Sequence, residues 1–259
     1  MARPHIQIKQ KLARNEPVVV LSGHYTIDMI DFLGPLGPDG IWIETEHGPV
    51  SWEQIGDMAR ACDLWDMASI TRVPANEPWI ITRTLDRGTS GITVPHVSTR
   101  AAAEQVVQSA KFGPIGQRGM YGSRRSYGVD APFQHANEET FIVVLIEELE
   151  AVQNLAEILT VDHIDVFFVA PSDLAQTMGH TGNNEHPEVQ ATIDRALKQI
   201  IDAGKTAGTL VTDQNVEHYL DLGVRFIYTA WTSWAARGLR QFQATVATRV
   251  ASQGMNASL

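Results

Sequence analysis

Charged side chains stand directly after the apolar runs of this sequence, at the points where buried strands would end. Ionisable groups are costly to bury unless they are paired or bind a ligand, so this recurrence indicates a polar site rather than a random surface. In folds with parallel strands, the carboxyl ends of the strands meet at one face, which carries the chemistry. The groups in these positions are Glu44, Glu46, His47, Arg72, His96, Glu147, Asp173 and Asp213.

Two of these carboxylates, Glu147 and Asp173, follow successive apolar runs and have no cysteine beside them. Such oxygen ligands suit a hard divalent cation such as Mg²⁺ or Mn²⁺, which keeps positions open for water and a chelating substrate. Glu148 and Glu150 are competing ligands, but Glu147 directly ends its apolar run. The alternative is a solvated acidic helix start, which the helix dipole favours. We favour the metal site.

His47 follows the run that ends at Glu44 and stands beside Glu46. A carboxylate next to an imidazole holds its tautomer and raises its basicity, as a general base requires. We therefore choose His47 as the candidate base, although a single histidine in a loop is more often a surface residue. His96, at another predicted strand end, ranks second and is expected to line the mouth of the fold.

Arg72 is the basic group that ends a predicted strand and faces these carboxylates. A permanently charged guanidinium can hold an oxyanion or a developing enolate. The structural alternative is a counter-ion to Glu44 or Glu147, and the two roles are compatible.

The segment around Asp173 shows the local pattern. Residues 166–170 are apolar throughout, as in a strand of a parallel sheet covered on both faces. Pro171 cannot donate to a strand ladder, and Ser172 and Asp173 are residue types that open a helix. The alternative is that they merely cap the following turn.

The same alternation of strand and helix recurs along all 259 residues, and a (β/α)8 barrel typically takes about 250. We predict a single (β/α)8 TIM barrel over residues 1–259, with a helix at Leu149–Leu159. A long irregular segment at 113–137, rich in Gly, Arg and Tyr, interrupts the pattern. The predicted strands are 18–23, 40–44, 67–74, 91–96, 141–147, 166–170, 206–213 and 225–231.

The composition argues against several classes of protein. A formal net charge of −10 disfavours nucleic acid or an anionic membrane as a partner, because both are bound by clustered Lys and Arg. Cys62 is the single cysteine, which excludes an intramolecular disulfide and fits a reducing compartment. No apolar targeting core opens the sequence, and no apolar stretch approaches the length of a membrane span. We expect a soluble, cytoplasmic protein.

Five motifs occur in a specific order and spacing. They are Ile43-Glu44-Thr45-Glu46-His47-Gly48-Pro49, Arg72-Val73-Pro74, Gly116-Gln117-Arg118-Gly119, Ile146-Glu147, and Ala170-Pro171-Ser172-Asp173-Leu174 with Met178-Gly179-His180. Together they resemble the class II pyruvate-dependent aldolases of the HpcH/HpaI family. The resemblance covers nearly the whole chain.

The resemblance implies a metal-dependent lyase that cleaves 4-hydroxy-2-oxo acids to pyruvate, or hydroxypyruvate, and an aldehyde, or that runs the reaction in reverse. It implies that Glu147 and Asp173 bind Mg²⁺, Mn²⁺ or Co²⁺, which chelates the 2-oxo acid. The backbone around Ala170, Ser172 and Asp173 would hold the carboxylate of the oxo acid at the helix start.

By the same resemblance, Arg72 would stabilise the enolate, and His47, oriented by Glu44, would take the proton of the 4-hydroxyl group. Members of the family are usually hexamers that exchange the last helix between subunits, so a hexamer or trimer is expected. An acidic residue after the third strand's helix approaches the neighbouring subunit's aldehyde site, and Asp86 is the matching position.

The sequence departs from the family pattern at several places that bear on substrate and rate. Glu44 stands where Asp is most common, and Leu145 replaces the Gln usually found two residues before the metal-binding Glu. Ala170 replaces Gly, and Trp231 with Trp234 replaces a small polar stretch after the eighth strand.

Two alternatives remain open. A CoA-thioester lyase of the citrate lyase β or malyl-CoA type would need a basic surface for the CoA phosphates, for which the arginine cluster (Arg118, Arg124 and Arg125) is the candidate, although we assign it to a loop at the barrel mouth. A non-catalytic keto-acid-binding barrel would bind metal and pyruvate without turnover. The aromatic residues expected near the mouth, as a lining or as packing, are Tyr121, Tyr127 and Trp231.

Overall fold

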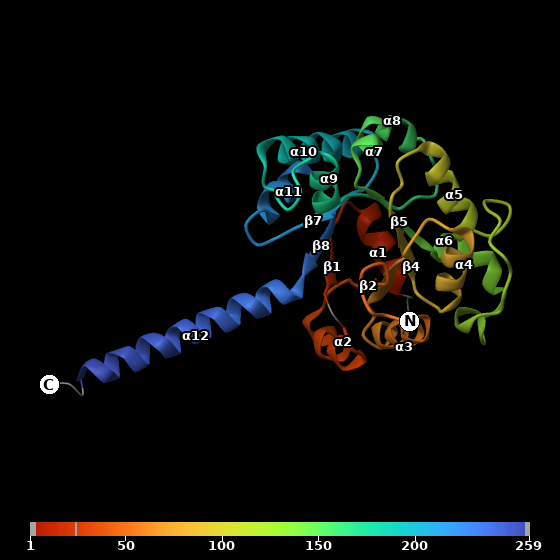
Figure 1. The fold of residues 1–259 in the computed structure, drawn as a ribbon. Coiled ribbons are helices and arrows are strands. Elements are labelled where there is room, and N and C mark those ends of the chain that lie inside the picture. Colours follow the sequence, from red (N-terminus) through yellow and green to blue (C-terminus); the bar gives the residue numbers. More distant parts are fainter. Residues whose placement is uncertain (1–3, 24, 257–259) are drawn as a thin grey trace.

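The computed structural model describes residues 4–23 and 25–256 and shows a closed barrel of parallel strands surrounded by helices (Figure 1). The strands follow chain order around the barrel, which closes by pairing of β1 with β8. They are β1 (Val18–Ser22), β2 (Gly40–Glu44), β3 (Ala68–Arg72), β4 (Gly91–Val94), β5 (Phe141–Ile146), β6 (Val166–Val169), β7 (Ala207–Leu210) and β8 (Phe226–Ala230). The predicted (β/α)8 barrel is confirmed.

Helices cover the outside of the barrel and connect successive strands. The α-helices are α1 (Pro4–Ala13), α2 (Ile27–Leu33), α3 (Trp52–Leu64), α4 (Pro78–Asp86), α5 (Arg100–Ala110), α6 (Pro132–Glu139), α7 (Leu149–Gln153), α8 (Leu155–Ile158), α9 (Pro171–Thr177), α10 (Pro187–Asp202), α11 (Val216–Leu222) and α12 (Trp231–Asn256). Two short 3-10 helices, η1 (Gly34–Leu36) and η2 (Arg124–Ser126), complete the set.

Both faces of the sheet are apolar, because side chains that point inward fill the barrel and those that point outward contact the helices. All six residues of β5 are buried, which explains why its sequence is apolar without alternation. Inside the barrel, Trp42, Phe168 and Tyr228 form an aromatic group with ring centroids 4.7 to 5.6 Å apart. This group lies directly beneath the strand ends that carry the charged residues.

The predicted helix at Leu149–Leu159 is divided into α7 and α8 at Asn154. The side chain of Asn154 donates a hydrogen bond from Nδ2 to the carbonyl oxygen of Ser98 at 2.9 Å. This bond ties the break between the two helices to the loop that follows β4.

The irregular segment that follows α5 lies at the amino-terminal end of the barrel, opposite the expected position. Arg124 Nη1 is 2.6 Å from Asp63 Oδ2, near the end of α3, and Arg125 Nη2 is 3.2 Å from Ser90 Oγ, just before β4. The assignment of the arginine cluster, Tyr121 and Tyr127 to the mouth was therefore wrong. Helix α5 returns the chain to the amino-terminal side, so a loop that follows the helix belongs there.

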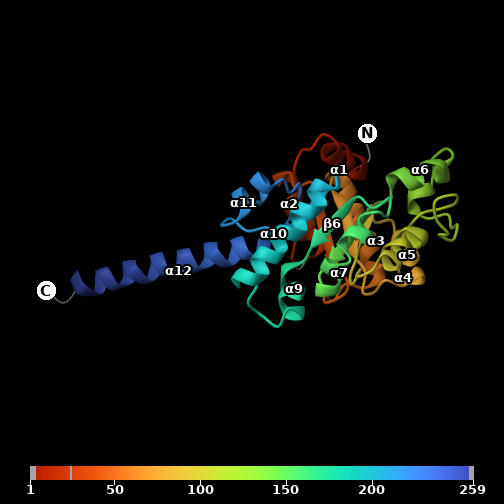
Figure 2. The same cartoon turned by 90° about the horizontal axis from the view of Figure 1, so that it is seen from above.

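Helix α12 leaves the barrel and projects away from it in both views (Figures 1 and 2). Large apolar side chains recur along it at helical spacing and are exposed: Leu239 (58%), Phe242 (67%), Val246 (47%) and Val250 (62%). Within the described part of the chain, no helix is both long and apolar enough to cross a membrane.

Candidate active site

Arg72 lies at the centre of the charged residues at the strand ends. Its Cα pairs with that of Glu44 across β2 and β3. Its side chain is only 12% exposed and faces three carboxylates: Nε contacts Glu46 Oε2, Nη1 is 3.6 Å from Glu44 Oε2, and Nη2 is 3.6 Å from Glu147 Oε2. The structure therefore shows Arg72 as a counter-ion to Glu44, Glu46 and Glu147.

Glu147, directly after β5, is fully buried. Its Oε1 accepts a hydrogen bond from the backbone N–H of His96 at 2.7 Å, whereas Oε2 has no hydrogen-bond partner among the described residues. Burial raises the pKa of Glu147 above its usual value, although the His96 N–H and Arg72 lower it, and the negative charge of Asp173 raises it further. A buried carboxylate with a free oxygen and a second acid nearby is stabilised by a bound cation.

Asp173 lies in the first turn of α9, where Pro171 occupies the first helical position and Ala170 is the N-cap residue. Asp173 is partly buried, and Ser172 is exposed. The first backbone N–H groups of a helix have no partner within it, which leaves those of Ser172 and Asp173 available to an anion. With the free oxygen of Glu147, the carboxylate of Asp173 provides the hard oxygen donors that fit Mg²⁺ or Mn²⁺.

His96, ranked second from the sequence, lies between several carboxylates. Its Nε2 is 3.6 Å from Glu46 Oε1, and its Nδ1 is 3.4 Å from Glu147 Oε1 and 3.0 Å from Glu148 Oε1. The backbone of His96 has a φ of 55°, which is uncommon outside glycine. The sequence signal was its place after Pro95 at a strand end, but nothing in the pattern indicated this central position.

The expected pairing of Glu44 with the His47 ring differs from the structure. Glu44 Oε1 accepts hydrogen bonds from the backbone N–H groups of Glu46 and His47, at 2.8 and 3.2 Å, and so holds the loop. Glu46 is the carboxylate nearest the ring, with Oε2 3.9 Å from His47 Nε2. Glu44 ends β2, and a side chain at that point satisfies the amides of the turn that follows it. The His47 side chain is 67% exposed.

Two other residues singled out from the sequence lie apart from this cluster. Asp86, at the end of α4, accepts a hydrogen bond from Arg118 Nη2 at 2.7 Å. Asp213, after β7, accepts one from Trp234 Nε1 at 3.0 Å and pairs with Arg237 on α12. Within one chain, neither contributes to the carboxylate cluster around Arg72.

A cavity of about 380 Å³ opens beside the cluster, near the ends of β1, β2, β3 and β8. Glu44, His47 and Arg72 line one part of it. Hydroxyl-bearing side chains line another part, and we call three of them the hydroxyl cluster: Ser22, Tyr25 and Tyr228; Thr232 lines the cavity as well. The sequence analysis missed these residues, because a Ser or Tyr in or near an apolar strand gives no signal that separates lining from packing.

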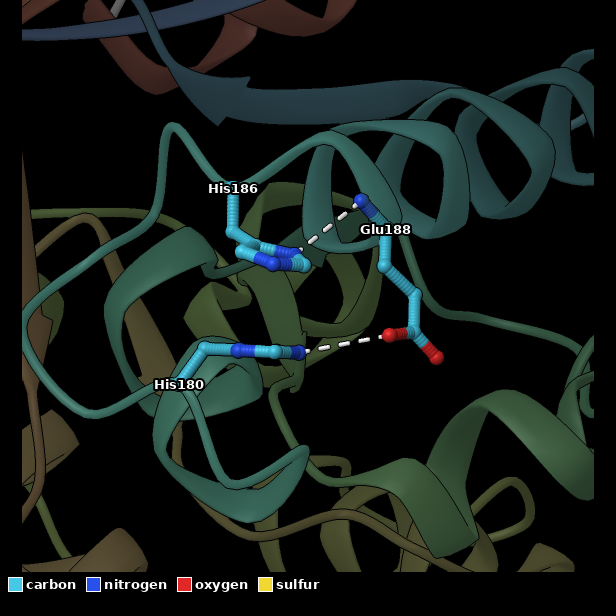
Figure 3. A group of neighbouring side chains, drawn as sticks. All are labelled: His180, His186 and Glu188. Atoms are coloured by element: carbon cyan, nitrogen blue, oxygen red, sulfur yellow. Dashed lines mark hydrogen bonds and ion pairs between the residues drawn. The ribbon is translucent and has the colours of Figure 1, made fainter.

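A separate group of possible metal ligands lies at the start of α10, formed by His180, His186 and Glu188 (Figure 3). His180 Nε2 lies 3.3 Å from Glu188 Oε2, and the Glu188 N–H donates to His186 Nδ1 at 3.3 Å. The imidazole rings are stacked, with centroids 3.7 Å apart and planes at 16°. Ring nitrogens bind an ion in the ring plane, so one ring would have to rotate before both could reach a single ion.

Comparison with known proteins decides the family. Residues 20–236 match the sequence pattern of the HpcH/HpaI aldolase/citrate lyase family. The chain belongs to this family. The resemblance recognised from the five motifs is confirmed, and it covers most of the barrel.

Individual relatives support the assignment of this chain to the HpcH/HpaI family. The chain is 35% identical over 239 residues to the hydroxypyruvate/pyruvate aldolase of Roseobacter denitrificans, with 89% of this chain and 92% of the relative covered. It is 35% identical over 212 residues to the 4-hydroxy-2-oxo-heptane-1,7-dioate aldolase of Shigella flexneri, with 80% and 78% covered. The solved structure of a family protein from Burkholderia cenocepacia superposes with a TM-score of 0.87 at 30% identity and covers 93% of this chain and 98% of the other.

Proposed function

We propose that this family member is a divalent-metal-dependent aldolase, a carbon–carbon lyase that cleaves 4-hydroxy-2-oxo acids to pyruvate, or hydroxypyruvate, and an aldehyde, or forms them. The observation that carries the proposal is the buried Glu147, whose Oε2 has no hydrogen-bond partner among the described residues although Arg72 and Asp173 are close. The aldolase relatives support the reaction class.

Glu147 and Asp173 would hold the ion, and their oxygen donors are compatible with Mg²⁺, Mn²⁺ or Co²⁺. When bound, the cation would supply Lewis acidity to the keto and carboxylate oxygens of the 2-oxo acid. The backbone N–H groups at the start of α9, around Ala170, Ser172 and Asp173, would bind the carboxylate of the same substrate.

In the cleavage direction, His47 accepts the proton of the 4-hydroxyl group as the bond between C3 and C4 breaks. The aldehyde leaves with the new carbonyl group, and the bonding electron pair passes to the remaining fragment as the enolate of pyruvate. Arg72 stabilises the enolate oxygen. Protonation of C3 then gives pyruvate. Glu44 contributes by fixing the backbone that positions His47.

The alternative of a CoA-thioester lyase receives no support from the arginine cluster. Arg118 binds Asp86, and Arg124 and Arg125 bind Asp63, all of them at the end of the barrel away from the carboxylates. These guanidinium groups are already engaged in ion pairs with carboxylates, which argues against a ready site for the phosphates of CoA.

We also propose that the protein is a homo-oligomer, a hexamer or a trimer, in which α12 is exchanged between subunits. The support is the row of exposed apolar side chains on a helix that contacts little of its own barrel. Asp86 would then approach the aldehyde site of a neighbouring subunit. The proposal includes a cytoplasmic location, which suits the single buried thiol of Cys62.

Exchange of the methyl protons of pyruvate in D₂O, followed by NMR, tests the proposed function without knowledge of the aldehyde. We expect exchange with Mg²⁺ or Mn²⁺ that stops after EDTA treatment. An intact protein that binds metal and pyruvate without exchange would instead be a keto-acid-binding barrel. An absence of pyruvate binding would exclude both.

A further inference from the structure

We infer that the cavity beside His47 binds the aldehyde half of the substrate, and that this aldehyde is uncharged and carries hydroxyl groups, which Ser22, Tyr25 and Tyr228 recognise. The inference rests on the proposed function, because His47 must reach the hydroxyl group on C4. Whatever is attached to C4 then extends into the space that His47 lines. The cavity, of about 380 Å³, lies within the usual size range of small-molecule sites.

The hydroxyl cluster is placed to form hydrogen bonds with such a ligand. Ser22 Oγ and Tyr228 Oη are 2.6 Å apart, and either can donate to the other. One hydroxyl of this pair therefore keeps a donor, and both keep lone pairs, for a third group. Tyr228 is held in place by its edge contact with Trp42, with ring centroids 4.7 Å apart.

Tyr25 provides the second observation. Its hydroxyl oxygen is buried and has no hydrogen-bond partner among the residues that the structure describes. Leaving a buried hydroxyl without a partner costs free energy, and a hydroxyl group of a bound substrate would remove that cost. Burial raises the pKa of Tyr25 and of Tyr228 above the usual value, so both stay protonated and able to donate.

The charges around the cavity disfavour an aldehyde that carries a carboxylate. Arg72 is the cation among the lining residues that the structure identifies, and it already faces three carboxylates. Glu44 lines the same space and would repel a second negative charge. A dioate substrate, such as that in the name of the Shigella flexneri relative, carries a second carboxylate that would enter this cavity.

The test compares three acceptors in the aldol direction with pyruvate as the donor: glyceraldehyde, propanal, which lacks the hydroxyl groups, and succinic semialdehyde, which carries a carboxylate. The kcat/KM for glyceraldehyde should exceed that for each of the others by at least about 10-fold, because a site that binds hydroxyl groups rejects analogues without them. In Tyr228→Phe, Tyr25→Phe and Ser22→Ala, the ratio of glyceraldehyde to propanal should fall at least about 5-fold.

Each ratio is measured within one variant, so a lower folded fraction cancels from it. Tyr219→Phe is the matched control, because Tyr219 is buried on α11 away from the cavity and should leave the ratio unchanged. A preference for succinic semialdehyde, or ratios unchanged in all three cavity variants, would overturn the inference while pyruvate exchange upholds the proposed function. Absence of pyruvate exchange in the wild type would overturn both.

Discussion

The two ends of the barrel bury charged groups in different ways. At the amino-terminal end, two lysines meet oxygen partners: Lys111, 2% exposed, donates to the carbonyl oxygen of Thr140 at 2.8 Å, and the partly buried Lys9 pairs with Asp165 at 3.0 Å. At the carboxyl end, four glutamates surround one arginine and two histidines. There, Glu46 Oε2 contacts Arg72 Nε, whereas Oε2 of the buried Glu147 has no hydrogen-bond partner among the described residues.

This difference indicates that the charged groups at the amino-terminal end serve stability, whereas those at the carboxyl end serve function. Paired charges and satisfied carbonyl groups at the amino-terminal end hold loops to the barrel, as is usual for that face. An excess of buried acid at the mouth is costly in the protein alone and is relieved by a bound cation. Substitutions at the two ends should therefore affect different measurements.

Glu147→Ala should have the largest effect, because it removes the carboxylate with the free buried oxygen. We expect metal-dependent exchange of pyruvate protons to fall to the uncatalysed background, because the chain loses one of the two proposed ligands of the ion. Glu150→Ala, in the first turn of α7, is the matched control and should keep exchange. Exchange that survives in Glu147→Ala would show that the ion binds elsewhere.

His47→Ala should have the next largest effect on activity. Loss of a general base typically lowers the rate by about 10² to 10⁴, and kcat for cleavage of a 4-hydroxy-2-oxo acid should fall by that factor. Metal affinity should not change, because His47 is outside the proposed donor set. The comparison is with His135→Ala, an exposed histidine on α6. Equal losses in the two variants would argue against His47 as the base.

Lys111→Met should change stability and not catalysis. It leaves the carbonyl oxygen of Asn137 without its lysine donor and removes one of the two lysine donors to the carbonyl oxygen of Thr140, since Lys9 remains. We expect a cost of roughly 1–3 kcal/mol in the free energy of unfolding. Urea denaturation measures this cost, and kcat should remain at the wild-type value. A large loss of kcat in a folded Lys111→Met protein would break the separation between the two ends.

The same lysine predicts a pH dependence. Burial lowers the pKa of Lys111 from 10.5 to about 8, so between these values the unfolded chain binds a proton that the folded chain lacks. Stability therefore rises with pH across this window, by about 1 kcal/mol per pH unit or less. Urea denaturation from pH 7 to 10 should show this gain in the wild type relative to Lys111→Met. If stability changed with pH equally in the wild type and in Lys111→Met, the predicted contribution of Lys111 would be contradicted.

The sequence predicted the barrel because its strands are buried on both faces and are therefore apolar throughout. It also placed Glu147 and Arg72 at strand ends, since the apolar run marks where each strand stops. It could not show which way a side chain turns in a loop. Glu44 binds backbone amides instead of the His47 ring, and the positive φ of His96 brings that residue among the carboxylates.

The position of the segment after α5 was missed for a different reason. Its Gly, Arg and Tyr residues resemble a substrate-binding loop in composition, but the side of the barrel on which a loop lies depends on whether it follows a strand or a helix. Residues such as Tyr228 were missed because a tyrosine within a strand is read as core. Its contact with Ser22 joins β1 and β8, which lie at opposite ends of the chain.

The central claim is that the excess carboxylates at the mouth bind a divalent cation. Titration of Mn²⁺ followed by EPR tests it most directly in the wild type, Glu147→Ala, Asp173→Ala and His186→Ala. The account predicts one tight Mn²⁺ per chain that is lost in the first two variants and kept in His186→Ala. Loss of binding in His186→Ala, with binding kept in Glu147→Ala and Asp173→Ala, would place the ion at the stacked histidines and contradict the account.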